Sequence, residues 1–249
     1  MNNYHKLTKE LIEFSYKYNL AYLPSSLSML NYLSILIPKL IDKNYKWVAG
    51  KQFGTQAYYT IYNHINRCDL IPEDVTKPLL LNKVNKEFTY IEETLGNSLG
   101  VAIGMSLTDK TPIWLNVSDS IFQMGRVLEA LPLLTRFNSN ILITIDGNNC
   151  TRSSMGKIES EYIRTLFMLN NIPLINIDLN DLSNYDNNLE LIDIYIGDSK
   201  NNWGPRAIYF NTIKGERIER FEMDPITWHY KRMTETEYNE IIQELEETK

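Results

Sequence analysis

Short apolar runs alternate along the chain with longer stretches in which apolar residues recur at helical spacing. The apolar runs predict strands at 46–49, 113–117, 141–145, 174–178 and 207–211, of which 113–117, 141–145 and 174–178 are expected to be buried. The helical spacing predicts helices at about 4–17, from the end of segment 21–28 to about 42, from the end of segment 50–55 to about 66, from 120 to 137 and at 157–170. A last helix is predicted from 234 onwards and opens on a capping box, Thr234 to Glu237. Strands that alternate with helices indicate an α/β fold, a doubly wound, mostly parallel sheet with helices on both faces.

Three stretches are harder to assign. Residues 67–94 mix polar residues with prolines, which predicts a long irregular connection. Residues 182–202 fit a helix or a strand equally. Gly96, Gly100 and Gly104 recur every four residues, a spacing typical of a helix face on which another backbone packs closely.

The segment 113–148 combines two strands and a helix into a βαβ unit. Its helix is expected to turn six apolar side chains inward: Phe122, Val127, Leu128, Leu131, Leu134 and Phe137. Such a unit has parallel strands and a right-handed crossover. Asp119 and Asn148 therefore follow the carboxyl ends of neighbouring strands, where open α/β sheets bind ligands.

The residue types at this edge suit a hard metal ion. The Asp119 carboxylate, the Asn148 amide oxygen and a backbone carbonyl from the following loop form an all-oxygen set that suits Mg²⁺ or Ca²⁺. A helix that starts just after Asp119 would add unpaired N–H groups for the phosphates of a ligand. The alternative is that Asp119 caps its helix and Asn148 only turns the chain.

Composition excludes several classes of protein. The 249 residues are 43% hydrophobic and 22% charged, which is ordinary for a globular protein, and we expect one domain over residues 1–249. The net charge of −6 and the lack of a basic block argue against nucleic acid as a partner. The N-terminus has no apolar signal core, no window is apolar enough for a membrane span, and two cysteines are too few for a disulfide framework. A cytoplasmic protein is expected.

The residues around Asp119 resemble a known cofactor motif. Ser118-Asp119-Ser120, followed roughly thirty residues later by Asn148, is similar to the thiamin diphosphate motif of transketolases. Four further positions are in register with that version of the motif: Gln123, Gly125, Glu129 and Ala130. The resemblance implies that Asp119, Asn148 and the backbone carbonyl of Cys150 hold Mg²⁺, or Ca²⁺, against the cofactor's diphosphate. Ser118 and Ser120, which would adjoin that diphosphate, replace glycines that allow close approach of a backbone to phosphate.

Other motifs follow the family's order along the chain. Residues 94–106 resemble its glycine-rich helix, whose start, at Gly96, approaches the cofactor. Lys214 and His229 resemble a late signature and would donate to the diphosphate or to a substrate phosphate. Tyr22 and Gln52 stand where the family has active-site histidines, so the resemblance places them, with His229, among the catalytic residues. Taken alone, such residues also fit packing or surface roles.

The resemblance spans nearly the whole chain, but only the diphosphate-binding half of a transketolase. It implies the thiamin diphosphate-binding fold and a separate partner chain that carries the pyrimidine-binding domain, and we expect a homodimer of such pairs. The implied activity is thiamin diphosphate- and Mg²⁺-dependent transfer of a two-carbon ketol or acyl unit between sugar phosphates or other carbonyl substrates. The replaced histidines suggest specialised sugar or secondary metabolism.

Two alternative functions stay open. Loss of both motif glycines and of three histidine positions, the third in the loop before the glycine-rich helix, favours an inactive regulatory or structural subunit. Retention of Asp119, Asn148, Lys214 and His229 together argues against it. An unrelated nucleotide-binding α/β protein is disfavoured because the chain has neither a P-loop nor a dinucleotide-binding glycine motif after a strand.

Overall fold

The structure is a computed structural model that describes residues 2–51, 53–66, 88–92, 94–108, 110–150, 158–197 and 204–247. The chain divides into two compact units. Unit 1 comprises Met1–Pro38, Phe53–Leu81 and Ile213–Lys249, and unit 2 comprises Lys39–Gln52 and Asn82–Thr212. Each unit is described by itself, and the single domain over residues 1–249 stays a prediction.

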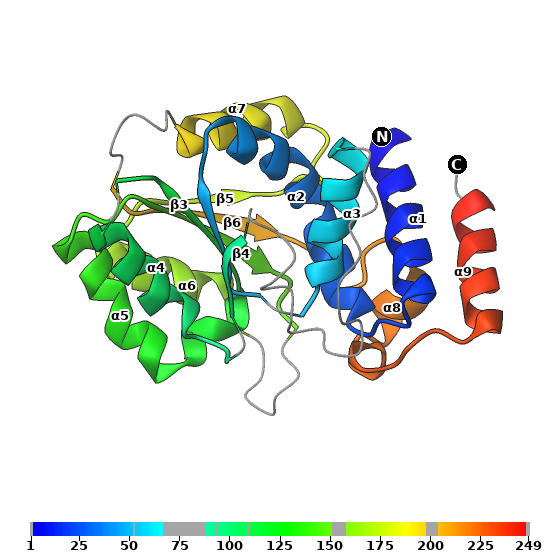
Figure 1. Cartoon of the computed structure of the whole chain (residues 1–249). Helices are drawn as coiled ribbons and strands as arrows, with labels where there is room; N and C mark the ends of the chain where they lie inside the picture. Colours follow the sequence, from blue (N-terminus) through cyan, green and yellow to red (C-terminus); the bar gives the residue numbers. More distant parts are fainter. Residues whose placement is uncertain are drawn as a thin grey trace. The chain divides into compact units, whose positions relative to one another are not determined.

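Unit 2 is built on a six-stranded sheet in which every neighbouring pair of strands is parallel (Figure 1). The strand order across the sheet is β2-β1-β3-β4-β6-β5. The strands are β1 (Lys46–Ala49), β2 (Phe88–Ile91), β3 (Ile113–Ser118), β4 (Ile141–Gly147), β5 (Leu174–Ile177) and β6 (Arg206–Asn211).

Strand β2 corrects one prediction. It lies in the stretch 67–94 that was expected to be an irregular connection, of which residues 67–87 lie outside the described residues. The β2 sequence Phe-Thr-Tyr-Ile is aromatic and β-branched, as strands prefer, but four residues are too few to give a clear pattern.

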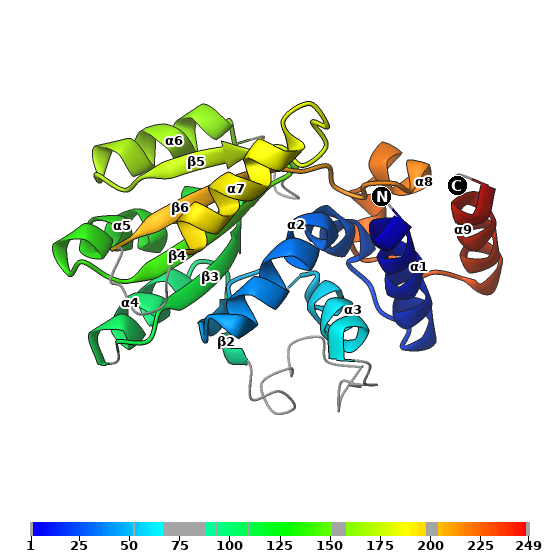
Figure 2. The same ribbon diagram turned by 90° about the horizontal axis from the view of Figure 1, so that it is seen from above.

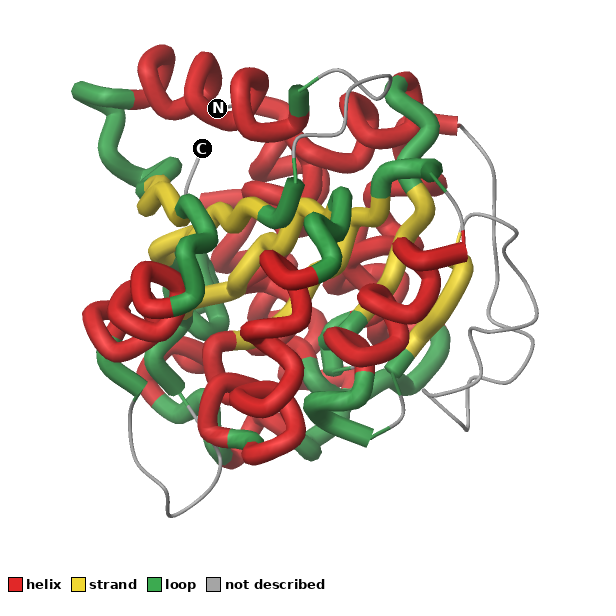
Figure 3. The backbone as a smooth tube through the Cα atoms, turned by 90° about the vertical axis from the view of Figure 1, so that its left-hand side faces the viewer, coloured by secondary structure: helices red, strands yellow, loops and turns green. Residues whose placement is uncertain are grey.

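Helices cover both faces of the sheet (Figure 2), which confirms the predicted α/β fold. On one face lie α4 (Ser98–Thr108), α5 (Gly125–Arg136) and α6 (Ser160–Leu169), and on the other lies α7 (Tyr185–Ile196). Figure 3 shows the strands side by side, with helices on either side of them. Helix α7 settles most of the ambiguous stretch 182–202 in favour of a helix, and residues 198–203 lie outside the described residues.

The core of unit 2 forms because alternate residues of the strands face the same helices. In β3, Ile113, Leu115 and Val117 join one buried apolar cluster with residues of β4, α4, α5 and α6. The predicted inward residues Phe122, Val127, Leu131 and Leu134 are buried in this cluster, and Leu128 packs against it partly buried. Phe137 was predicted wrongly: it follows the end of α5 at Arg136, and 44% of it is exposed.

Two further predictions are wrong because the position of an element in the fold overrides its sequence pattern. Strand β5 was predicted to be buried, but it forms an edge of the sheet, and Asn176 in it is exposed. Gly100 and Gly104 were expected to lie against another backbone. Both are exposed, and a Cβ at either would meet no atom of the described residues within 4 Å, since α4 packs through its Leu99, Ala102 and Ile103 side.

The carboxyl end of α7 is held by a buried arginine from the start of β6. The Arg206 guanidinium donates to the Tyr195 carbonyl at 2.5 Å and to the Ile196 carbonyl at 3.2 Å, both from the last turn of α7. It also donates to the Tyr45 hydroxyl at 2.7 Å, and 4% of Arg206 is exposed. The last carbonyls of a helix have no partner within the helix and carry its negative dipole end, so a cation there satisfies both needs.

Replacing Arg206 by Met should lower the free energy of unfolding by about 2–4 kcal/mol, because buried carbonyl groups would lose their donors. Urea denaturation of the full chain measures this change. The matched control is Arg164→Met, since the Arg164 side chain is 71% exposed and its nearest carboxylate, on Glu161, lies 3.9 Å away. The control should change stability by less than about 0.5 kcal/mol. Equal effects of the two variants would contradict a capping role for Arg206.

Unit 1 is helical. Helix α1 (Asn2–Lys17) packs on α3 (Thr55–Asn66) and on α9 (Glu235–Glu247), where Tyr16 and Tyr238 stack with ring centroids 4.1 Å apart. The capping box of α9 is confirmed: the Thr234 N–H donates to Glu237 at 3.0 Å, and the Glu237 N–H donates to the Thr234 hydroxyl at 3.3 Å. Unit 1 also contains α2 (Leu23–Asp42) as far as Pro38, α8 (Glu219–Met223) and the 3₁₀ helix η3 (Thr227–His229).

None of the helices in the described residues combines the length and apolar character that a membrane crossing requires.

Candidate functional site

Polar residues gather at one edge of the sheet in unit 2, where four neighbouring strands end. Asp119 follows β3 directly, and Asn148 follows β4 directly. Lys51 comes just after β1, Thr212 follows β6, and Asp146 lies near the end of β4. Because the strands are parallel, their carboxyl ends meet at the same edge and place these residues together.

The Asp119 carboxylate ties the end of β3 to the loop after β4. Asp119 is 1% exposed, and its Oδ2 accepts the backbone N–H of Asn149 at 2.8 Å. A short 3₁₀ helix, η2 (Asp119–Gln123), starts at this residue, and its N-cap is Ser118 without a side-chain capping bond. The sequence left two interpretations of Asp119, a metal ligand or a helix cap. The structure shows that Asp119 is not the helix cap.

The structure also corrects the expected start of the helix after Asp119. Helix α5 begins only at Gly125, because Met124 has extended backbone angles (φ −87°, ψ 124°) that separate η2 from α5. The backbone N–H groups close to Asp119 therefore belong to η2 and to the loop after β4, and the dipole of α5 starts further along the chain.

Burial and charge make Asp119 costly to ionise. Burial, and after it the nearby negative charge of Asp146, raise the pKa of Asp119 to about 6, although the Asn149 N–H and the Lys51 ammonium act in the opposite direction. At neutral pH the carboxylate is ionised against this cost. A bound cation would relieve it.

Asn148 makes a compact turn at the end of β4. Its Nδ2 donates to Asp146 Oδ2 at 2.8 Å, and its Oδ1 accepts the Cys150 N–H at 3.0 Å. The alternative interpretation of the sequence, that Asn148 turns the chain, predicted such a turn. It is compatible with a ligand role, since an amide oxygen has a second lone pair. In the proposed metal set only the backbone carbonyl of Cys150 takes part.

Asp146 is held from three sides. The Lys51 ammonium forms an ion pair with Asp146 Oδ2, and the Thr212 hydroxyl donates to Asp146 Oδ1 at 2.5 Å. Together with the Asn148 amide, these donors satisfy a carboxylate that is fully buried. Lys51 and Thr212 were not predicted as site residues, although each closely follows a predicted strand, as Asp119 does.

The two serines that replace motif glycines adopt ordinary backbone conformations. Ser118 has φ −92° and ψ 157°, which any residue can adopt, and Ser120 is not among the described residues with positive φ. The backbone angles at these positions therefore do not require glycine. The two hydroxyls lie 2.5 Å apart and share a hydrogen bond.

The start of α4 is bound by a buried glutamate. Glu92 accepts the backbone N–H of Ser98 at 2.9 Å, the hydroxyl of Ser98 at 3.0 Å and the backbone N–H of Asn97. Burial raises the pKa of Glu92, while these donors and the Gly96 N–H lower it. Gly96 has a φ of +93°, which favours glycine. Since its N–H faces Glu92, any contact of Gly96 with a ligand would have to come from its carbonyl or Cα. The sequence analysis also missed Glu92.

In unit 1 the structure brings Tyr22 and His229 together. The Tyr22 N–H donates to the His229 carbonyl at 3.1 Å, and their ring centroids lie 5.0 Å apart. The Ser25 hydroxyl lies 3.5 Å from Nδ1 of His229, and Phe53 packs on both rings. Tyr22 has a φ of 65°, a conformation that is uncommon for a bulky residue and costs energy. The surrounding contacts hold Tyr22 in this strained form.

Lys214 lies in the same unit and is 7% exposed. The N–H of the next residue, Gly215, donates to the Pro24 carbonyl at 3.0 Å, so the segment of Lys214 adjoins the segment of Tyr22. Gln52 lies outside the described residues. The cofactor-binding and catalytic roles of all these residues remain predictions.

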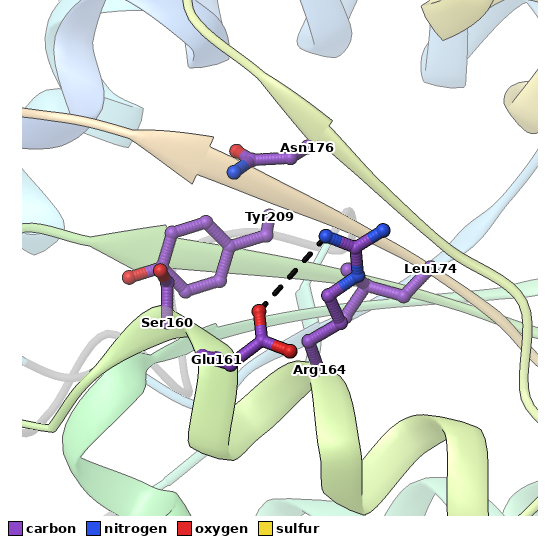
Figure 4. A pocket seen from close by; sticks show the side chains of 6 residues that line it. All are labelled: Ser160, Glu161, Arg164, Leu174, Asn176 and Tyr209. Carbon is purple, nitrogen blue, oxygen red and sulfur yellow. Dashed lines mark ion pairs between the residues drawn. The ribbon is translucent and has the colours of Figure 1, made fainter.

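Unit 2 also contains a cavity of about 130 Å³ between the start of α6 and strands β5 and β6 (Figure 4). It is lined by Ser160, Glu161, Arg164, Leu174, Asn176 and Tyr209. The Tyr209 ring packs directly on Gly147, where a Cβ would lie 2.1 Å from Tyr209 Cζ, and its hydroxyl lies 3.5 Å from Asn149 Oδ1. Tyr209 therefore supports the turn that carries Asn148.

The donor set at the sheet edge fits a hard cation. It combines the buried Asp119 carboxylate with the turn of Asn148 and Cys150, in a region where two carboxylates face one ammonium. In the described part of the chain, no group of three or more His, Cys, Asp or Glu side chains is placed to hold a metal. A site here would therefore depend on amide and carbonyl oxygens besides one carboxylate.

Comparisons with solved structures identify the fold. The chain superposes on a transketolase from Campylobacter jejuni with a TM-score of 0.74 over 99% of its length, at 16% sequence identity. A transketolase from Leishmania mexicana gives a TM-score of 0.66 over 98% of this chain at 11% identity. The chain has the transketolase fold.

This transketolase-like chain is much shorter than the proteins it resembles. It spans 41% of the Campylobacter protein and 44% of the Leishmania protein. A transketolase variant from Pichia stipitis, in complex with fructose 6-phosphate, is matched over 45% of its length with a TM-score of 0.55 and 12% identity. Neither a model of any protein family nor any curated protein matches the sequence.

Replacing Asp119 by Asn should stabilise the ligand-free chain at pH 8 by roughly 2–3 kcal/mol, since each pKa unit is worth about 1.4 kcal/mol. A folded-state pKa of about 6, in place of 3.8, means that stability falls as pH rises between these values, because ionisation is harder in the folded state. The advantage of the variant should therefore shrink to about half at pH 5.

Urea denaturation at both pH values measures this change. Glu161→Gln is the matched control, because its side chain is 77% exposed, and it should show no advantage at either pH. An Asp119→Asn chain that is less stable than the wild type at pH 8 would contradict the raised pKa and the cost of ionising this buried carboxylate.

Proposed function

We propose that this chain is the N-terminal subunit of a two-chain transketolase-like enzyme. The enzyme would use thiamin diphosphate and Mg²⁺ to transfer a two-carbon ketol or acyl unit between sugar or other carbonyl substrates. The observation that carries the proposal is the Asp119 carboxylate. It is buried at the carboxyl edge of the sheet and bound to the turn that follows Asn148, in a chain with the transketolase fold.

The proposed metal set assigns a separate task to each residue. Asp119 would supply the charged oxygen, while the Asn148 amide and the Cys150 carbonyl would add neutral oxygens, a combination that suits Mg²⁺. The hydrogen bond from the Asn149 N–H holds Asp119 in place before any ligand arrives, so less ordering is needed on binding. Burial of Asp119 limits the access of water to its carboxylate.

When bound, thiamin diphosphate supplies the carbanion chemistry that breaks and forms the C–C bond, and the protein supplies binding and orientation. Lys214 and His229 would add positive charge and a hydrogen-bond donor toward phosphate groups. Ser118, Ser120 and Gly96 would adjoin the diphosphate, and Tyr22 and Gln52 would lie toward the substrate. Two observations support a role for Tyr22: its strained backbone and its packing on His229.

The length of the match supports the proposal of a partner chain. This chain spans less than half of each transketolase described above. We propose that the remainder of the site, including a pyrimidine-binding domain, comes from a separate chain, and that two such pairs associate. Because Tyr22 and Gln52 stand where the family has histidines, we further propose a substrate from specialised sugar or secondary metabolism.

An inactive subunit is the second candidate, and specific contacts favour it. The hydroxyls of Ser118 and Ser120 are bound to each other, and the N–H groups at the start of α4 are bound to Glu92. Groups that are already paired offer less to a diphosphate. Whether the assembled protein binds the cofactor therefore separates the two candidates.

The first test is to purify the tagged chain from its own host and to assay the complex for thiamin diphosphate and Mg²⁺. We expect a co-purifying chain with a pyrimidine-binding domain and about one cofactor per pair. In the same complex, Asp119→Ala should weaken Mg²⁺-dependent cofactor binding at least about 100-fold, since it removes the charged ligand. Glu161→Ala, an exposed carboxylate of the same unit, is the control. A complex that binds no cofactor even at saturating concentrations would identify the inactive subunit.

The substrate proposal has its own test. The reconstituted pair should turn over xylulose 5-phosphate at least about 100-fold more slowly than an ordinary transketolase assayed beside it, because the chain lacks histidines at two expected positions. The change Tyr22→His should raise that rate if position 22 contacts the sugar. An ordinary rate for the wild-type pair would remove the reason to propose a specialised substrate.

A further inference from the structure

A buried lysine next to the proposed cation site is the feature that the proposed function leaves unexplained. Lysine is among the residues least often buried, because taking an ammonium out of water is costly. Lys51 is nevertheless 5% exposed, and its ion-pair partner Asp146 is fully buried. An ion pair of this kind adds little stability compared with apolar residues of the same size, so its presence calls for a further explanation.

The hydrogen bonds around Asp146 fix the ammonium in position. Asp146 accepts from Thr212 through one oxygen, and from Asn148 and Lys51 through the other. Asn148 thereby connects the ion pair to the turn that would hold the metal. Lys51 is thus a fixed charge rather than a mobile side chain.

The charges of this cluster act on one another. Asp146 lies opposite Ser118, the residue before Asp119, in the pairing of β3 with β4, and Lys51 is bound to Asp146. At this position Asp146 raises the pKa of Asp119 and Lys51 lowers it. With both carboxylates ionised, the cluster of Asp119, Asp146 and Lys51 carries one negative charge. A divalent cation would make the total one positive charge. Without the ammonium, the same cation would leave the cluster neutral.

We propose that Lys51 sets the charge of this site, so that the site with Mg²⁺ bound is net positive and attracts a diphosphate group. The inference rests on the proposed function and extends it to the order of binding. Lys51 weakens binding of Mg²⁺ alone through repulsion, and it strengthens binding of diphosphate once Mg²⁺ is present. The site therefore takes up the metal together with the diphosphate in preference to the metal alone.

This proposal predicts opposite effects of one substitution, which a purely structural ion pair does not. In Lys51→Met, Mg²⁺ alone should bind about threefold tighter, and inorganic pyrophosphate at saturating Mg²⁺ should bind about tenfold weaker. Both affinities are measured by titration calorimetry on the full chain, together with any partner that co-purifies. Loss of folding alone would weaken both.

Three further variants separate charge from structure. Lys39→Met is the matched control: it is the same substitution in the same unit, and it removes a more exposed ion pair, with Asp193, so neither affinity should change. Lys51→Arg retains the charge and should stay within about twofold of the wild type.

The double variant Lys51→Met with Asp146→Asn restores the total charge and avoids an unpaired buried carboxylate, so it remains informative if the single variant does not fold. We expect both of its affinities to return to within about threefold of the wild type.

The outcomes distinguish this inference from the proposed function. A wild-type chain that binds neither Mg²⁺ nor pyrophosphate would overturn both. A wild type that binds both ligands, with a Lys51→Met variant in which the two affinities fall together or do not change, would overturn only the role of Lys51. A double variant that binds pyrophosphate as poorly as Lys51→Met would also overturn it, because charge would then not be the cause.

Discussion

The burial of two neighbouring carboxylates is the constraint on which the sheet edge of unit 2 depends. Asp146 is compensated by an ammonium, a hydroxyl and an amide, whereas Asp119 receives the Asn149 N–H and the more distant influence of Lys51. The compensation is therefore uneven. Asp146 is satisfied within the protein, and Asp119 is the carboxylate that gains most from a cation. The chain maintains this arrangement by drawing these donors from the ends of three different strands, β1, β4 and β6.

The parallel sheet makes that convergence possible, and most of it could be predicted. The strands β3 and β4 are strongly apolar and buried along their whole length, so their pattern shows in the sequence. The short strand β2 and the exposed edge strand β5 were predicted less well. Whether a short run pairs as a strand, and whether that strand lies at the edge of the sheet, depends on the strand order of the assembled sheet. Phe137 shows the same limit at a helix end, where one residue beyond α5 the side chain is exposed.

The site could be predicted only as far as its residues are close in sequence or belong to one βαβ unit. Asp119 and Asn148 satisfy that condition, because two adjacent parallel strands bring them together. Lys51 and Thr212 come from β1 and β6, and their link to Asp146 depends on a strand order that the sequence does not state. Glu92 was missed for a similar reason, since it follows β2, the strand that was not predicted. The strained backbone of Tyr22 has no signature in the sequence, because the contacts that hold it come from distant segments.

The extended backbone of Ser118 has a consequence for how such proteins are found. A pattern that asks for glycine on both sides of the aspartate passes over this chain, which has serine at both positions. In this chain the aspartate is positioned by the end of a strand, and its neighbours lie within the conformational range of any amino acid. Divergent relatives would then be detected better by strand register and by the spacing between acid and amide than by glycine. Chains that such patterns have passed over deserve a second search on that basis.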